Sequence, residues 1–252
     1  MRAALEITRH KARLMVDDVQ LIAFLVLLPV LAMVFFSYGL LPPPGGRVDA
    51  NGADQAVPGM AVLFGFLVAD SVGHGLFREF GWGTWQRLRT GPVGVSAQLF
   101  GLVAPYAVLA TVQVLVLHAI GALALGMHFS GTVPALLVMA TAAGITTAAL
   151  GMVLVAISRT TQQMSSSANT LAIVLAGISG ALTPVERLPG WVQGVAHVTP
   201  HYWALQGYRS IVIDGAGLAQ VAPNALCLLG IAAVLGVVAI ARLRRRPTDR
   251  SL

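Results

Sequence analysis

Long uncharged stretches such as VPALLVMATAAGITTAALGMVLVAI, residues 133–157, decide the fold of this chain. The stretch has no charged side chain, and a helix needs about 20 such residues to cross a hydrocarbon layer about 30 Å thick. Of all 252 residues, 56% are hydrophobic and 10% are charged. Soluble domains have about 25% charged residues. The composition therefore predicts an all-α membrane protein.

Five further stretches are apolar enough, or nearly so, to cross a membrane. The weakest begins SSSANT and needs burial among other helices, where its hydroxyls and Asn169 would find partners. The six predicted transmembrane helices are residues 21–41, 57–77, 99–125, 133–157, 166–182 and 222–241.

The basic residues predict the orientation of these helices. Six helices would put both termini on one side of the membrane, with 13 of the 16 Lys and Arg residues, leaving Arg47, Arg187 and Arg209 on the other. Positive charge marks the cytoplasmic side. We expect a multi-pass protein of the cytoplasmic (inner or plasma) membrane with both termini inside and an outer loop over residues 183–221.

Residues 1–19 combine apolar residues at helical spacing with basic residues. This pattern predicts an amphipathic interfacial helix on the inner leaflet, although a solvated tail fits the same composition. A cleaved signal peptide is disfavoured because the apolar stretch that follows exceeds a signal core of about 7–15 residues and no clear A-x-A site follows it.

Several function classes find no support in the sequence. The basic residues lie at the ends of apolar stretches, which favours membrane lipids over nucleic acid as their partner. Lys11 is the only lysine and follows His10, so there is no phosphate-binding loop for ATP. His197 and His201 have zincin spacing, but Val198 replaces the general base and Pro200 interrupts the helix. We expect a non-enzymatic chain that binds no metal or cofactor itself.

The stretch FREFGWGTWQRLRTGPVG, residues 77–94, separates the second and third predicted transmembrane helices. Its tryptophans would lie at the level of the lipid headgroups while Glu79, Arg87 and Arg89 project into the cytoplasm. Both a short surface helix over residues 78–94 and a plain loop with aromatic anchors fit this pattern.

The same stretch resembles the first cytoplasmic loop of permease subunits of type-2 ABC exporters, of the drug-resistance and daunorubicin-type efflux family. That loop has a pattern close to E-x-x-x-G-T-x-[ED]-R-L-x-x-x-P, although Gln86 stands here at the usual acidic position. The stretch 188–209 is similar to the family's outer segment before the last helix. The matching residues are Glu79, Gly83, Thr84, Arg87, Leu88 and Pro92 in the first motif, and Pro189, Trp191, Pro200, Tyr202 and Arg209 in the second.

The resemblance implies an exporter permease for an amphipathic or hydrophobic compound such as an antibiotic, with glycan or lipid export as the alternative. A second permease, identical or paralogous, and two ABC ATPase subunits that bind ATP and Mg²⁺ would complete the transporter. A coupling helix would contact the ATPase, and short outer helices would form an outer gate. The residues implied are Glu79, Trp82, Gly83, Thr84, Trp85, Arg87, Leu88, Arg89 and Pro92 for coupling, and Trp191, Pro200, Tyr202 and Arg209 for the gate.

Polar residues within two predicted transmembrane helices are candidates for the substrate pathway. Asp70 and His74 are one helical turn apart, and intramembrane ionisable groups are functional candidates. They could contact substrate, neutralise each other, or relay protons in a secondary carrier. The fifth helix has two further sets: polar residues Ser166, Asn169 and Thr170, and a ladder of small residues, Ala168, Ala172, Ala176 and Gly180, which fits helix packing or pathway lining.

Overall fold

The computed structural model describes residues 19–39, 51–81 and 95–244, and every element in these ranges is helical. The all-α prediction is therefore confirmed for this part of the chain. The elements are α2 (Val19–Gly39), α3 (Gly52–Gly81), α5 (Val95–Ala124), α6 (Val133–Ile157), α7 (Thr161–Ser179), the 3₁₀ turn η1 (Val185–Arg187), α8 (Gly190–Ala196), α9 (Pro200–Val212) and α10 (Leu218–Arg244).

Each of the six predicted transmembrane helices overlaps a helix in the structure. Among the described residues, four helices are long and apolar enough to cross a membrane, within α3, α5, α6 and α10. α2 contributes a shorter apolar helix, Leu25–Gly39. α7 begins five residues before the predicted stretch, and its first turns are polar. Six complete membrane crossings therefore stay a prediction, as does the interfacial helix over residues 1–19, which lies outside the described residues.

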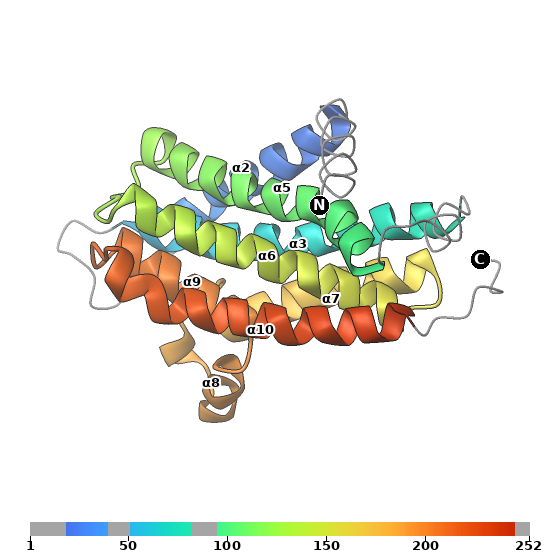
Figure 1. The fold of residues 1–252 in the computed structure, drawn as a ribbon. Helices are drawn as coiled ribbons and strands as arrows, with labels where there is room; N and C mark the ends of the chain where they lie inside the picture. Colours follow the sequence, from blue (N-terminus) through green and yellow to red (C-terminus); the bar gives the residue numbers. More distant parts are fainter. Residues whose placement is uncertain (1–18, 40–50, 82–94, 245–252) are drawn as a thin grey trace.

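Two helices, α3 and α6, form the centre of the bundle. The most apolar part of α3 is 72% buried, against 22% for α10. α6 packs against α10, α5 and α3, and α3 packs against α2, α5, α6 and α7. α3, α6 and α10 run in one direction and α5 and α7 in the other (Figure 1). The outer surfaces of α5 and α10 expose large apolar side chains, as expected for helices that face lipid.

Local sequence sets several helix boundaries. Asn51 caps α3, since its Oδ1 accepts hydrogen bonds from the backbone N–H groups of Ala53 and Asp54. Thr160 caps α7 in the same way through the N–H of Gln163, 3.1 Å away. At the other end of α7, Gly180 adopts a left-handed conformation with φ of 94°. Such a conformation favours glycine and ends the helix.

The two ends of the bundle differ in charge. The end formed by the last turns of α3, α6 and α10 holds Arg78, Arg159, Arg242 and Arg244, and we call it the basic end. Among the described residues, the opposite end holds Arg187 and Arg209 together with three acidic residues, Asp54, Glu186 and Asp214. This segregation follows the pattern from which the sequence predicted a cytoplasmic side.

Helix α9 lies inside the bundle for part of its length. Thr199 caps it and Pro200 occupies its first turn, where a missing N–H costs nothing. The ring of His201 stacks on Phe66 of α3 at a centroid distance of 3.9 Å, and both side chains are fully buried. Phe66 is close to the middle of α3, so α9 starts deep and returns toward the opposite end. Both short helices expected in 183–221 exist, but α9 is wedged into the bundle and does not simply cap it.

Candidate functional site

The predicted coupling segment begins differently from expectation. α3 continues to Gly81, so Arg78 and Glu79 belong to its last turns and not to a separate helix. The side chain of Glu79 is only 7% exposed. The expectation that Glu79 projects into the cytoplasm therefore does not hold, because the continuing helix turns this carboxylate toward the bundle. The other predicted coupling residues lie outside the described residues: Trp82, Gly83, Thr84, Trp85, Arg87, Leu88, Arg89 and Pro92.

Asp70, His74 and Ser165 form a cluster between α3 and α7, which we call the Asp70 cluster. Ser165 donates a hydrogen bond to Asp70 Oδ1 at 2.5 Å. His74 Nδ1 lies 3.5 Å from the same oxygen and 3.1 Å from the backbone carbonyl of Asp70. The side chain of Asp70 is 25% exposed and that of His74 is 54% exposed. The cluster therefore joins two helices and still presents an acid–histidine pair at the surface of the isolated chain.

The predicted polar residues of α7 continue this surface. Ser166, Asn169 and Thr170 are all exposed, and apolar Ile173 and Val174 follow them along the same helix. A shallow depression of about 350 Å³ lies beside Ser166, Thr170 and Val174. The structure thus brings Asp70 and His74 close to the polar start of α7. The result is an amphipathic face suited to a ligand with polar and apolar parts.

The ladder of small residues lies on the opposite side of α7. Ala168, Ala172 and Ala176 are at most 3% exposed, and α7 packs mainly against α3. Gly180 ends the helix and is buried as well. A stripe of small side chains allows two helix backbones to approach closely. This placement favours the interpretation of the ladder as a packing surface within the chain.

Two of the predicted gate residues, Pro200 and Tyr202, lie at the corner between α8 and α9, whereas Arg209 lies in the last turn of α9. Tyr202 packs against the rings of His197 and Trp203, and the indole N–H of Trp203 donates to the carbonyl of His197 at 2.8 Å. Burial raises the pKa of the Tyr202 hydroxyl above its ordinary value, with Glu186 adding to the rise and Arg209 opposing it. The remaining predicted gate residue, Trp191, lies in the first turn of α8 and is 73% exposed. The corner is therefore held by contacts among His197, Tyr202 and Trp203, and Trp191 remains exposed on α8.

The two histidines with zincin spacing are separated by the same corner. His197 is exposed at the end of α8, where Nδ1 lies 2.7 Å from the Gln193 carbonyl. His201 is buried on α9 against Phe66. The Pro200 break thus sends the two rings in different directions, and they do not share a helix face.

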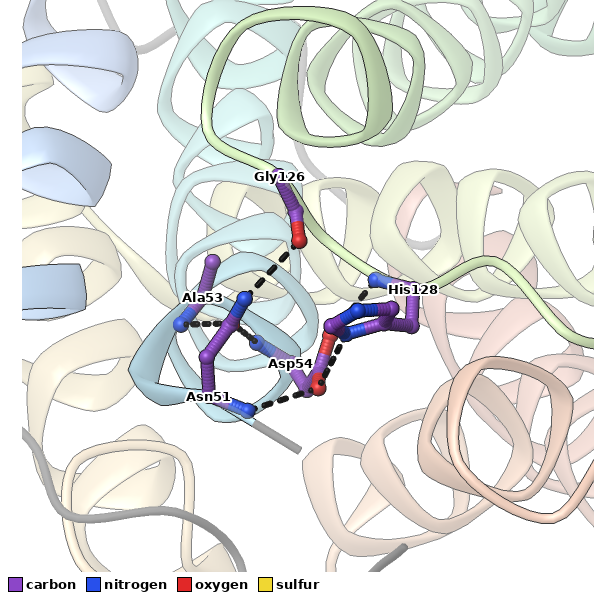
Figure 2. Close-up of polar contacts among 5 residues, drawn as sticks. All are labelled: Asn51, Ala53, Asp54, Gly126 and His128. Carbon is purple, nitrogen blue, oxygen red and sulfur yellow. Dashed lines mark hydrogen bonds and ion pairs between the residues drawn. The ribbon is translucent and has the colours of Figure 1, made fainter. Parts of the chain in front are cut away.

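A second acid–histidine cluster, absent from the sequence predictions, joins α3 to the turn between α5 and α6. Figure 2 shows Asp54 between Asn51 and His128. Asp54 accepts hydrogen bonds from the His128 backbone N–H at 2.7 Å and from the Asn51 N–H at 3.0 Å, and its Oδ2 lies 3.1 Å from His128 Nδ1. Asn51 also donates to the Gly126 carbonyl at 2.9 Å. We call this group the Asp54 cluster.

A local signal for half of this cluster exists in the sequence. The pattern Asn-x-x-Asp at 51–54 is typical of a helix start, since a capping side chain and an acidic first turn both stabilise it. No local signal pairs Asp54 with His128, because 74 residues separate them.

Comparison with known proteins places this geometry in a family. Residues 42–241 match the family model described as ABC-2 family transporter protein. The "Linearmycin resistance permease protein LnrN" of Bacillus subtilis (strain 168) is 24% identical over 201 residues, which is 78% of this chain and 51% of that protein. The "Probable multidrug ABC transporter permease YbhR" of Escherichia coli (strain K12) is 25% identical over 187 residues, 74% of this chain and 50% of that protein.

A eukaryotic protein also shows the similarity. The "ABC transporter G family member 20" of Dictyostelium discoideum is 26% identical over 178 residues, which is 70% of this chain and 24% of that protein. The chain thus spans about half the length of the bacterial relatives that it matches. The family match covers most of the chain and includes α3 through nearly all of α10. The chain is a multi-pass membrane protein that belongs to the ABC-2 transporter family.

Proposed function

We propose that this chain is the permease subunit of an ATP-driven exporter that moves an amphipathic or hydrophobic compound across the cytoplasmic membrane. The observation that carries the proposal is the family match over residues 42–241 on a bundle of apolar helices. Two relatives are named as a linearmycin resistance permease and a probable multidrug permease, which supports a drug as the compound. ATP and Mg²⁺ would bind to separate ATPase subunits, so the chain itself would be non-catalytic.

Force from the ATPase would enter at the basic end, which we place in the cytoplasm. Residues 82–94 connect the end of α3 to the start of α5, and their charged and aromatic residues would contact the ATPase. α3 is suited to pass a displacement onward because it packs against α2, α5, α6, α7 and α9. A helix that is buried on most sides moves with its neighbours and not alone. Buried Glu79 would fix the end of α3 within the bundle and leave Arg87 and Arg89 to dock.

The substrate would pass along the exposed face of α7. This face combines Ser166, Asn169 and Thr170 with apolar residues, and the Asp70 cluster lies beside it. Two copies of such a face, from this permease and a second one, would enclose an amphipathic path. Two ATPase subunits, one for each permease, would complete the assembly. Glycan or lipid export fits the same architecture, and only identification of the transported compound distinguishes it from drug export.

Charge reversal in residues 82–94 tests the coupling. The double substitution Arg87→Glu and Arg89→Glu should abolish co-purification of the ATPase and ATP-dependent efflux of a hydrophobic dye from vesicles. Arg187→Glu, at the opposite end of the bundle, is the matched control and should change neither. Co-purification and efflux that both survive the double substitution would contradict the proposed docking role.

A proton-coupled carrier is a second candidate, favoured by the half-exposed Asp70–His74 pair. The two functions predict different energy sources in the same vesicles. An exporter powered by ATP continues to transport when the proton gradient is collapsed by an uncoupler. A carrier stops under this treatment, and Asp70→Asn abolishes its activity whether or not ATP is present. Efflux that is independent of ATP and depends on the proton gradient would identify the chain as a proton-coupled carrier and contradict the ATP-driven exporter.

A further inference from the structure

An apolar groove lies on the side of the bundle formed by α5, α6 and α10. It is separate from the proposed substrate face on α7, a helix that packs mainly against α3. Its volume is about 520 Å³. α6 forms the floor with Ile145, Ala148, Ala149 and Met152, and α5 and α10 form the walls. Small side chains create the space, and the floor and walls come from three different helices. These three helices run side by side in Figure 1.

The groove extends from the middle of the bundle toward the basic end. Its wall on α5 begins at Thr111 and ends at Phe100, a rise of about 16 Å at 1.5 Å per residue. The floor on α6 covers the same length, from Thr141 to Met152. This distance is about half of a hydrocarbon layer about 30 Å thick. The groove therefore has the length of one leaflet and lies in the leaflet next to the basic end.

The lining offers no free hydrogen-bond donor to an occupant of the groove. The hydroxyl of Thr111 donates to the Ala107 carbonyl at 2.8 Å, and that of Thr141 donates to the Leu137 carbonyl at 2.7 Å. Both hydroxyls are thus satisfied within their own helices, and the other lining residues are apolar. An occupant of this part must itself be apolar, because a buried polar group without a partner is costly.

Cationic side chains lie about two helical turns beyond the groove, toward the basic end. Arg244 follows Gly236 of the groove by about two turns of α10 and about 80° around the helix, whereas Arg242 is about 120° away in the opposite sense. Arg159 follows the floor helix α6 at the same end, and both Arg159 and Arg244 are exposed. Guanidinium groups are well suited to bind phosphate. Apolar length followed by positive charge is complementary to a phospholipid with an anionic headgroup.

We propose that this groove holds one acyl chain of an anionic phospholipid from the leaflet next to the basic end, with its phosphate bound by Arg244 and Arg159. Basic sites between transmembrane helices bind anionic headgroups in this manner. The lipid would fill the space between α5 and α10 and hold both helices against α6. The inference depends on neither the transported compound nor the ATPase, so it can fail or succeed independently of the proposed function.

Two glycines of α10 offer a matched test. A side chain added at Gly236 meets open space, as does one added at Gly230, but only Gly236 lines the groove. Gly236→Phe should therefore fill the groove without disturbing the fold, and Gly230→Phe is the control for size and position. Native mass spectrometry of the detergent-purified full chain, supplied with phosphatidylglycerol or phosphatidylcholine, measures the retained lipid. We expect Gly236→Phe to lose the retained lipid and Gly230→Phe to keep it.

A second pair of variants tests the headgroup. Arg244→Glu should lower the retention of phosphatidylglycerol by at least about fivefold, the effect of losing one basic residue near an anionic lipid surface, because it also adds a negative charge. Retention of phosphatidylcholine should stay unchanged, and the control Arg242→Glu should have little effect on either lipid. Equal retention of both lipids by the unmodified chain would overturn the anionic preference.

Three results would overturn the site itself. If Gly236→Phe retains as much phosphatidylglycerol as the unmodified chain, no lipid occupies the groove. A change in the oligomeric state of Gly236→Phe without any loss of lipid would assign the groove to a second copy of the chain. If Gly236→Phe loses binding of the transported dye but keeps the lipid, the groove is a substrate site.

Discussion

α3 carries two acid–histidine clusters, and they differ in how completely the protein satisfies them. Asp54, in the first turn, is 3% exposed and accepts hydrogen bonds from His128 and Asn51. Asp70, in the second half of the helix, bonds Ser165 and lies 3.5 Å from the ring nitrogen of a half-exposed His74. In the first cluster the carboxylate is buried and only the His128 ring is partly exposed, whereas in the second the carboxylate itself is partly exposed.

This difference separates a structural role from a functional one. A buried carboxylate with all its partners in place joins elements firmly, because removal of any partner leaves a costly unpaired group. A partly exposed carboxylate beside a histidine ring contributes little to stability and stays available to a ligand. Both clusters are built around an Asp–His pair, so the burial and the hydrogen bonds of that pair make the difference.

The largest effect on stability is expected from Asp54→Ala. This substitution leaves the backbone N–H groups of His128 and Asn51 without their acceptor. Both groups are partly buried, so each loss should cost toward the lower end of the about 1–3 kcal/mol typical of a buried unpaired group. We expect the free energy of unfolding to fall by about 2–4 kcal/mol, as measured by denaturant titration in detergent micelles. Asp214→Ala, at an exposed acidic residue of the same end, is the control. Equal stability of both variants would refute a structural role for the Asp54 cluster.

Two glycines of α3 extend the comparison to packing. A Cβ at Gly59 would overlap the backbone carbonyl of Ala181, whereas one at Gly73 would meet only the flexible side chain of Met164. Gly59→Ala should therefore cost about 1–3 kcal/mol, as overpacking against a fixed backbone does. Gly73→Ala should cost less than about 1 kcal/mol, because methionine adapts its shape.

Thermal melting in detergent measures both glycine variants. The control is Gly177→Ala on α7, where an added methyl group meets open space and should stabilise the helix by about 0.5–1 kcal/mol. A larger loss for Gly73→Ala than for Gly59→Ala would show that the second half of α3 is the more rigidly packed.

The smallest effect on stability is expected from Asp70→Asn and Ser165→Ala. The Asp70 cluster is partly exposed, so each substitution should change the free energy of unfolding by less than about 1 kcal/mol. Efflux from vesicles should fall for Asp70→Asn if the cluster contacts the transported compound. A loss of stability similar to that of Asp54→Ala would make both clusters structural.

The sequence predicted the positions of the helices well and their contacts poorly. Residues 133–157 were predicted and found with the same bounds, because an uncharged apolar stretch between polar turns is a local property. Glu79 was predicted to point away from the bundle, but α3 continues past it and buries it. The depth of α9 was also missed. A short stretch with one proline break indicates a helix boundary but not the residue on which His201 stacks.

The sequence by itself determined that the chain is a membrane-embedded bundle, since the length and hydrophobicity of each stretch decide whether it can enter a bilayer. It also determined which end of the bundle is basic, because the arginines lie at helix ends. The tertiary structure alone decided that Asp54 meets His128, 74 residues away, and that Ser165 meets Asp70, 95 residues away. Contacts of this kind depend on how whole helices pack, and helix packing in lipid is decided by the shapes of many side chains together.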